Sequence, residues 1–293
     1  MKKWRKFAAV ALTVVTAMSV FAGCGDAKTS SGTTAEAKIT DSELTTDVKA
    51  IKDRGVLKVG VKNAVIGFGY QDALTGEYSG MEIELAKKIA EYIGVDVEFT
   101  AVTAATRTEL LDSGDIDCVL ATFTITDERK KSWDFTTPYF TDHVSVLVEN
   151  SSNMKSLADM KGKTVGVSSG STSARSLVQA MIDNKVITGE GFSKETFDAA
   201  TWTDGVSFKQ YDDYPTISTA LSAGEVQAFC VDKSILAIYN TGSRSYISEE
   251  FAPQEYGIAT KKGSTFSELT EKLVKEWLSD GTINGLITEN KLN

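Results

Sequence analysis

Leu111-Asp-Ser-Gly-Asp-Ile-Asp-Cys-Val-Leu-Ala-Thr122 is repeated in outline by Leu221-Ser-Ala-Gly-Glu-Val-Gln-Ala-Phe-Cys-Val-Asp232. A second pair, Leu57-Lys-Val-Gly-Val61 and Lys163-Thr-Val-Gly-Val167, precedes it in each half of the chain. The two pairs are offset by 110 and 106 residues, which agrees within the variation of loop length. Their order and matching separation indicate an internal duplication, in which two lobes are built on one plan.

Strand and helix patterns alternate in the same order in both halves. Residues 116–121 form a near-continuous apolar run, which is typical of a strand buried on both faces. Residues 81–93 place their apolar side chains mostly on one helical face. The predicted strands are 56–61, 95–99, 116–121, 164–167, 208–211 and 226–231, and the predicted helices are 81–93, 107–113, 174–182 and 216–223. This alternation predicts an α/β fold with parallel sheets.

The C-terminal region does not form a third repeat. It contains one predicted strand and two predicted helices, at residues 257–261, 266–278 and 283–292. We expect this single strand and its helices to complete the first lobe. The chain would then cross between the lobes near residues 144–149 and again near 256–260. Two crossover strands form a hinge, which lets lobes open and close without unfolding. The expected first lobe comprises residues 46–146 and 258–293, and the expected second lobe comprises 147–257.

The N-terminus has the pattern of a secretory signal. Four basic residues within positions 2–6 precede an apolar stretch at 7–21, and the segment ends in Phe21-Ala-Gly-Cys24. Residues 1–23 are therefore predicted to be removed. Small residues before Cys24 resemble a bacterial lipobox, which predicts lipidation of Cys24, a flexible tether at residues 24–45 and anchoring on the extracytoplasmic face of a membrane. The alternatives are ordinary cleavage beside an incidental cysteine, or a retained anchor.

Composition excludes several classes of function. The chain has 31 Lys and Arg against 40 Asp and Glu, a formal net charge of -9, and nucleic-acid binding needs a basic face instead. It has one histidine, His143, and three cysteines. These numbers argue against a disulfide scaffold, a histidine-based zinc site and a Ser–His–Asp triad. We therefore expect no metal, no cofactor and no catalytic residue.

Polar residues follow four of the predicted strands. They are Lys62, residues 121–124, residues 168–172 and Asp232. In open parallel α/β sheets, ligands bind beyond the carboxyl ends of the strands. If the duplicated lobes face each other, these four strand ends converge on one cleft, and clefts between lobes are the usual place for a small molecule.

The residues at these strand ends suit a zwitterion. Arg129, shortly after the strand at 116–121, and the backbone N–H groups of the turn at 168–172 would bind a carboxylate. Asp232 would bind an ammonium group. Each feature also has an ordinary explanation. Arg129 lies in the charge run Asp-Glu-Arg-Lys-Lys and could lie on a solvated face, Asp232 could cap the following helix, and the turn could be a plain loop.

Several motifs resemble a known family. They are Thr75-Gly-Glu-Tyr-Ser-Gly80, Thr124-Ile-Thr-Asp-Glu-Arg-Lys-Lys131, Asp134-Phe-Thr-Thr-Pro-Tyr-Phe140 and Leu157-Ala-Asp-Met-Lys-Gly-Lys-Thr-Val-Gly-Val167. From about residue 54 to the C-terminus, the chain resembles the polar amino-acid substrate-binding proteins of bacterial ABC importers, extracellular solute-binding protein family 3. The resemblance implies the two-lobed periplasmic-binding-protein fold of type II (Venus-flytrap), with duplicated α/β lobes joined by two crossover strands. It also implies a monomer that delivers its amino acid to a membrane permease driven by an ATPase.

The resemblance also assigns roles to individual residues. It implies that Arg129 binds the ligand α-carboxylate and that Asp232 binds the α-ammonium. Nearby hydroxyl and backbone groups would come from Ala121, Thr122, Thr124, Ser171 and Thr172. Tyr214 and Tyr256 could reach the ligand or serve only in packing.

The resemblance is greatest to members that take glutamate or aspartate. Many members place an aromatic ring in the loop after the first strand and another near residue 104, whereas this chain has Asn63-Ala-Val-Ile-Gly-Phe68 and Ala104. Charge replaces the rings, because Lys62 and Arg107 lie at neighbouring positions. With Arg129 and Asp232 they give a formal site charge of +2, which an acidic ligand compensates better than a neutral one. Glutamine and cystine remain the alternatives.

Two rival functions have different requirements. A cyclohexadienyl-dehydratase-like enzyme on the same fold would need a positioned general acid, and no unassigned acid at a strand end clearly qualifies. An extracellular sensor or adhesin would keep the fold without transport. We therefore expect a binding protein and not an enzyme.

Overall fold

The computed structural model describes residues 38–292. The predicted signal peptide, Cys24 and the first part of the predicted tether lie outside these residues. Within the described residues, no helix combines the length and the apolar character needed to cross a membrane.

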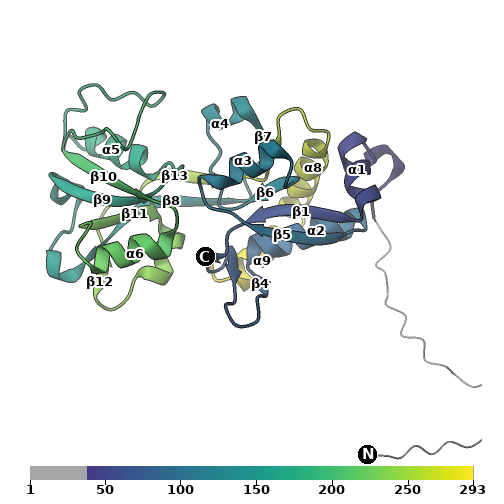
Figure 1. The fold of residues 1–293 in the computed structure, drawn as a ribbon, viewed down its shortest axis with the longest axis horizontal. Coiled ribbons are helices and arrows are strands. Elements are labelled where there is room, and N and C mark those ends of the chain that lie inside the picture. Colours follow the sequence, from purple (N-terminus) through teal and green to yellow (C-terminus); the bar gives the residue numbers. More distant parts are fainter. Residues whose placement is uncertain (1–37, 293) are drawn as a thin grey trace, which may run out of the picture. The chain divides into compact units, whose positions relative to one another are not determined.

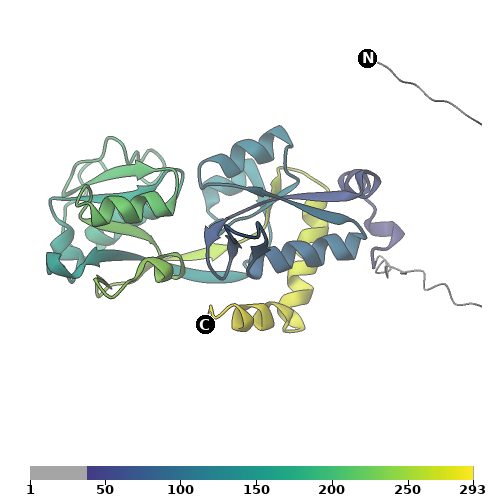
Figure 2. The same ribbon diagram turned by 60° about the horizontal axis from the view of Figure 1, so that its bottom comes forward.

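The first lobe is built on a five-stranded sheet with strand order β5-β1-β6-β14-β7. Its strands are β1 (Val56–Val61), β5 (Asp96–Ala101), β6 (Cys118–Leu120), β7 (Trp133–Phe135) and β14 (Ala259–Lys261), and a small second sheet contains β2 (Ala64–Val65), β3 (Gly69–Gln71) and β4 (Tyr78–Ser79). Its helices are α1 (Thr46–Arg54), α2 (Met81–Ile93), α3 (Thr106–Ser113), α4 (Asp127–Ser132), α8 (Phe266–Ser279) and α9 (Thr282–Glu289), with the 3-10 helix η1 (Asp41–Glu43). Figure 2 shows α8 beside the strands of this lobe, whereas α9 packs on α8 and α2.

The second lobe is built on a six-stranded sheet with strand order β10-β9-β11-β8-β12, in which β13 also pairs with β8. Its strands are β8 (Phe140–Glu149), β9 (Lys163–Ser168), β10 (Val206–Tyr211), β11 (Ala228–Asp232), β12 (Arg244–Tyr246) and β13 (Phe251–Tyr256). Its helices are α5 (Ser173–Asp183), α6 (Tyr214–Ser222) and α7 (Lys233–Leu236), with the 3-10 helices η2 (Asn150–Ser152), η3 (Leu157–Met160) and η4 (Ala237–Tyr239).

The strand registers confirm the duplication. In the first sheet β1 runs parallel to both β5 and β6, and β14 is antiparallel to β6. In the second sheet β9 runs parallel to both β10 and β11, and β8 is antiparallel to β11. Gly60 pairs with Val119, and Gly166 pairs with Phe229, so the two Val-Gly-Val motifs occupy the same place in their sheets. The α/β prediction and the predicted helix at 81–93 are confirmed.

Two strands, β8 and β13, run between the two sheets (Figure 1). The first crossing is made by the start of β8. The Phe140 ring packs on Phe68 of the first lobe, with ring centroids 5.0 Å apart, whereas Val144–Leu147 already pair with β11 inside the second sheet. The crossing thus begins upstream of the expected residues 144–149. The second crossing lies at Gly257 and Ile258, within the predicted segment, and β14 then completes the first sheet as expected.

The end of the predicted tether is ordered. The backbone N–H groups of Lys38 and Ile39 donate to the Tyr92 carbonyl. Glu43 accepts hydrogen bonds from the Tyr92 hydroxyl and from Lys272. These contacts hold residues 38–44 on the first lobe, so the prediction of a flexible segment is wrong for this part of the chain.

Gly60 and Gly166 are required by close packing. A Cβ atom at Gly60 would lie 2.6 Å from Ile116 Cδ1, and a Cβ atom at Gly166 would lie 2.6 Å from Ile217 Cγ2. We expect Gly60→Ala and Gly166→Ala each to lower the free energy of unfolding by about 1–3 kcal/mol, because a well-packed core must shift to admit the methyl group. Urea denaturation measures this loss.

The matched control for this prediction is Gly242→Ala. No atom lies within 4 Å of the Cβ position at Gly242, and its backbone is not left-handed. Its unfolding free energy should stay within about 0.5 kcal/mol of the parent, as is usual for surface changes. Equal stability of all three variants would contradict the packing argument.

Candidate functional site

Three cations lie at the strand ends of the first lobe. Lys62 follows β1, Arg107 lies in the first turn of α3, and Arg129 lies in α4. Lys62 and Arg107 are each 3% exposed, whereas Arg129 is partly exposed. None of the ion pairs formed by residues 38–292 includes any of the three. Buried cations are normally paired, so this arrangement leaves positive charge to be compensated.

Phe123 lies against both guanidinium groups. Arg107 lies 3.8 Å and Arg129 lies 4.6 Å from the centroid of the Phe123 ring. Arg107 Nη1 donates to the carbonyls of Ala121 at 2.9 Å and Thr122 at 3.4 Å. The ring and these carbonyls attract the two cations without neutralising them.

Arg129 reaches across to the second lobe. Its Nη1 donates to the Thr124 carbonyl at 2.7 Å, and its Nη2 donates to the Gly170 carbonyl at 3.0 Å. Gly170 belongs to the turn at 168–172 that precedes α5. Arg129 and the turn at 168–172 are predicted to lie at one site. The hydrogen bond from Arg129 to Gly170 brings them together across the two lobes.

A buried acid lies among the cations. Glu82, near the start of α2, is fully buried, and its Oε1 accepts hydrogen bonds from Thr122 N and from Tyr139 Oη, each at 2.6 Å. Its Oε2 has no hydrogen-bond partner among the described residues. Burial raises the pKa of Glu82 to about 6, although the Lys62 and Arg107 charges partly offset this effect. Glu82 thereby reduces the formal charge of the predicted set from +2 to +1.

Burial also acts on the cations themselves. It lowers the pKa of the Lys62 ammonium well below its usual value, and the nearby Arg107 charge lowers it further. It lowers the pKa of Arg107 to about 10. The Glu82 and Asp232 charges oppose both effects, which shows that these four groups interact electrostatically.

Asp232 ends β11 of the second lobe and is 5% exposed. Its Oδ2 accepts a hydrogen bond from Tyr256 Oη at 2.5 Å. Burial and the charge of Asp142 raise its pKa to about 7. Its side chain makes no capping hydrogen bond to α7, so the helix-cap explanation is wrong.

The two predicted tyrosines are both buried. Tyr256 is fully buried and stacks on Phe140 with ring centroids 5.8 Å apart. Tyr214 lies below the Lys62 ammonium, which is 5.4 Å from the centroid of its ring. Both tyrosines pack in the interior. Burial and the nearby Asp232 charge raise the pKa of each hydroxyl group.

Gln254, on β13, connects the predicted hydroxyl groups of the two lobes. Its Oε1 accepts from Thr124 Oγ1 at 2.9 Å and from Thr172 Oγ1 at 2.7 Å. Its Nε2 donates to the Ala252 and Pro253 carbonyls, which fixes the orientation of the amide. Both hydroxyls therefore donate to Gln254 and keep their oxygen lone pairs free to accept.

Two pockets border this region. One of about 280 Å³ is lined by Arg129, Ser171 and Thr172, and one of about 360 Å³ is lined by Thr124, Thr172 and Gln254. Arg175 lines both, and its Nη1 forms a 2.5 Å ion pair with Glu128 of α4. Residues of both lobes thus surround the open space beside Arg129.

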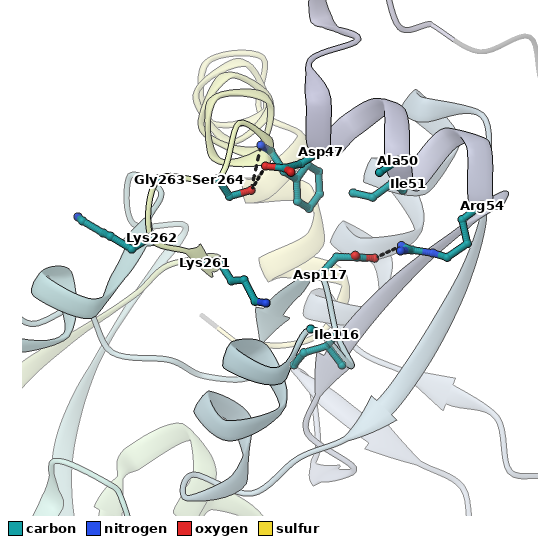
Figure 3. Close-up of a pocket in the computed structure, with 12 residues that line it drawn as sticks. Asp47, Ala50, Ile51, Arg54, Ile116, Asp117, Lys261, Lys262, Gly263 and Ser264 are labelled. Carbon is teal, nitrogen blue, oxygen red and sulfur yellow. Dashed lines mark hydrogen bonds and ion pairs between the residues drawn. The ribbon is translucent and has the colours of Figure 1, made fainter.

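Another pocket, of about 350 Å³, lies at the opposite end of the first sheet (Figure 3). It is lined by residues that precede β1 and β6, among them Arg54 and Asp117, which pair with each other. Asp47 in the same pocket accepts hydrogen bonds from Ser264 and Thr265. Ligands of parallel α/β sheets bind at the carboxyl ends of the strands, so this pocket lies at the wrong end.

Four residues at the site were not singled out from the sequence: Glu82, Phe123, Asp142 and Gln254. Glu82 had a detectable signal, because it is a carboxylate on the apolar face of the helix predicted at 81–93, in line with Ala86 and Ile89. Asp142 and Gln254 lie on the crossover strands, and only their pairing in three dimensions brings them to the site.

Comparison with known proteins agrees with this architecture. Residues 57–289 match the bacterial extracellular solute-binding proteins, family 3, and the chain belongs to that family. It is 32% identical to the ABC transporter glutamine-binding protein GlnH of Bacillus subtilis, over 94% of each chain. It is 26% identical to the L-glutamate/L-aspartate-binding protein of Pseudomonas aeruginosa, over 85% of this chain and 80% of that one.

A solved structure shows the same fold. An ancestral arginine-binding protein bound to arginine aligns with a TM-score of 0.67 and 33% identity, covering 80% of this chain and 98% of that one. The chain is therefore an extracellular solute-binding protein of family 3, and the relatives above are named as amino-acid-binding proteins.

Proposed function

We propose that this protein binds glutamate or aspartate between its two lobes and delivers it to the permease. The observation that carries the proposal is the group of three cations, Lys62, Arg107 and Arg129, which form no ion pair with any carboxylate of the described residues. A dicarboxylic amino acid brings two carboxylates and one ammonium group to such a site.

Each ligand group has a matching partner in the proposal. Arg129, at the pocket beside Ser171 and Thr172, binds the α-carboxylate. Asp232 binds the α-ammonium. Arg107 and Lys62 lie deeper and bind the side-chain carboxylate.

The buried Nε of Arg107 supports this assignment, because it has no hydrogen-bond partner among residues 38–292. A buried donor without an acceptor is costly, and a ligand oxygen would remove that cost. A carboxylate beside Lys62 would also restore the charged state that burial disfavours.

Glutamine is the second candidate, and one observation favours it. The glutamine-binding relative from Bacillus subtilis is more similar to this chain than the glutamate/aspartate-binding one. Cystine remains a further alternative.

Isothermal titration calorimetry with glutamate, aspartate, glutamine and cystine tests the proposal. We expect Arg107→Ala and Lys62→Met to weaken glutamate binding at least about tenfold more than glutamine binding, because a charge-assisted hydrogen bond contributes about 1.5–3 kcal/mol. Lys58→Met removes the same charge near the amino end of β1, beside Asp117 and away from the site, and should leave the preference unchanged. Equal losses for the two ligands would contradict the assignment of Arg107 and Lys62.

We further propose that ligand contacts with both lobes favour the closed form, since a ligand shifts an equilibrium only through contacts that differ between the states. In the same proposal the protein acts as a monomer that is anchored to the outer face of the membrane by a lipid on Cys24.

A further inference from the structure

Two buried carboxylates share one hydroxyl group at the hinge. Tyr256 Oη lies 2.5 Å from Asp232 Oδ2 and 3.3 Å from Asp142 Oδ2. A phenol has a single proton to donate, so it can serve only one of the two carboxylates at a time. Asp142 lies on β8 and Tyr256 on β13, the two strands that run between the lobes.

The two carboxylates differ in their other donors. Asp142 accepts from the Ser234 backbone N–H at 3.1 Å and from the Ser234 hydroxyl, and its Oδ1 accepts from the His143 backbone N–H at 2.8 Å. The Asp232 carboxylate has no donor other than Tyr256 among the described residues. Donors stabilise the ionised form of a carboxyl group, and Asp232 has fewer of them, so a proton taken up at this pair resides on Asp232.

We propose that Asp142 and Tyr256 are positioning residues with opposite effects on a proton at Asp232: the Asp142 charge favours the proton, the Tyr256 hydrogen bond disfavours it, and the ligand ammonium group displaces it. Binding then converts the Asp232 carboxylic acid to a carboxylate paired with the ammonium, and the proton passes to solvent. This inference rests on the proposed function, because it needs an ammonium-bearing ligand at Asp232.

The charged groups around Asp232 set the pH range. Lys62 just after β1, Arg107 on α3 and Arg129 on α4 favour its carboxylate, whereas Asp142 on β8 opposes it. The remaining titratable neighbours are Tyr214 on α6, Tyr256 on β13 and Cys230 on β11 itself.

The balance of these groups gives Asp232 a pKa of about 7. Below this pH, the proton competes with the ligand. Affinity should therefore fall about tenfold for each pH unit.

The experiment measures the dissociation constant of the tightest-binding amino acid from pH 5 to pH 8.5, for the parent protein and two variants. Asp142→Asn removes the repelling charge and should move the acid limb of the profile down by about one pH unit or more. Tyr256→Phe removes the hydrogen bond to the Asp232 carboxylate and should move the acid limb of the profile to higher pH. A purely structural role would weaken binding at every pH without moving the profile in opposite directions.

His143 provides the control, because it is the one histidine of the chain, its side chain is exposed, and its backbone N–H is kept in any variant. His143→Gln should leave the profile unchanged. Carbon-13 NMR of the Asp232 carboxyl in the ligand-free protein gives an independent readout, with titration near pH 7 that moves lower in Asp142→Asn.

The possible results distinguish failure of the proton linkage from failure of the proposed function. Amino-acid binding that does not depend on pH, or a profile that only His143→Gln changes, would overturn the proton linkage and leave the proposed function intact. Failure of every amino acid to bind the parent protein at any pH would overturn both.

Discussion

Replacing Arg129 with alanine is expected to abolish measurable amino-acid binding. The guanidinium is the partly exposed cation of the site, it borders the pocket with Ser171 and Thr172, and it already joins the Thr124 and Gly170 carbonyls. A ligand carboxylate would accept two charge-assisted hydrogen bonds from it. Their loss, at about 1.5–3 kcal/mol each, corresponds to a weakening of roughly 10²- to 10⁴-fold.

Calorimetry on Arg129→Ala and Lys130→Ala checks this result. Lys130 is the next residue of α4 and is exposed, so its removal deletes the same charge without touching the site. We expect Lys130→Ala to bind as the parent does. Affinity of Arg129→Ala within about tenfold of the parent would mean that Arg129 does not hold the carboxylate.

Gly170→Ala is expected to impair closure of the lobes. Gly170 has a left-handed φ of +73°, and a Cβ atom there would lie 2.8 Å from the Ala104 carbonyl oxygen and 3.0 Å from Ala105 Cα. These are backbone atoms of the first lobe, so they cannot be moved aside like the end of a flexible side chain. The added methyl group is accommodated only if the lobes move apart, at a cost of about 1–3 kcal/mol, or about 5- to 150-fold in affinity.

Gly224→Ala separates this effect from backbone strain. Gly224 also has a φ of +73°, but no atom lies within 4 Å of its Cβ position. Both variants should lose similar stability from the left-handed conformation, about 1 kcal/mol. Only Gly170→Ala should also lose affinity and show a larger radius of gyration by X-ray scattering at saturating ligand. Equal affinities would contradict a steric contact between the lobes.

The regular parts of the fold could be predicted because their signals are local. The helix predicted at 81–93 coincides with α2, and the strand predicted at 56–61 coincides with β1. Short strands such as β7 and β12 have no local signal of this kind, since each has three residues and is defined by its partner strand. The start of the first crossing was placed a few residues too late for the same reason, because β8 acquires its role only by pairing with β11 and β13.

The site shows the same division between local and long-range information. Lys62, Arg107, Arg129 and Asp232 could be selected because they follow predicted strands or begin predicted helices. The contacts of Glu82 and Asp142 depend on partners 40 and 92 residues away, at Thr122 and Ser234. No spacing rule in the sequence identifies such pairs, so the charge count from the sequence omitted Glu82 and overestimated the positive charge.

The position of β14 has a consequence for how the chain acquires its structure. The second sheet is made from one continuous segment, residues 140–256, whereas the first sheet needs β14 from residues 259–261 between β6 and β7. A polypeptide emerging from its N-terminus therefore holds an unfinished sheet, with an open edge at β6, until almost the whole chain is available. The first lobe therefore begins to form first but completes its sheet last. Premature termination before Ala259 would leave the edge at β6 exposed and free to aggregate.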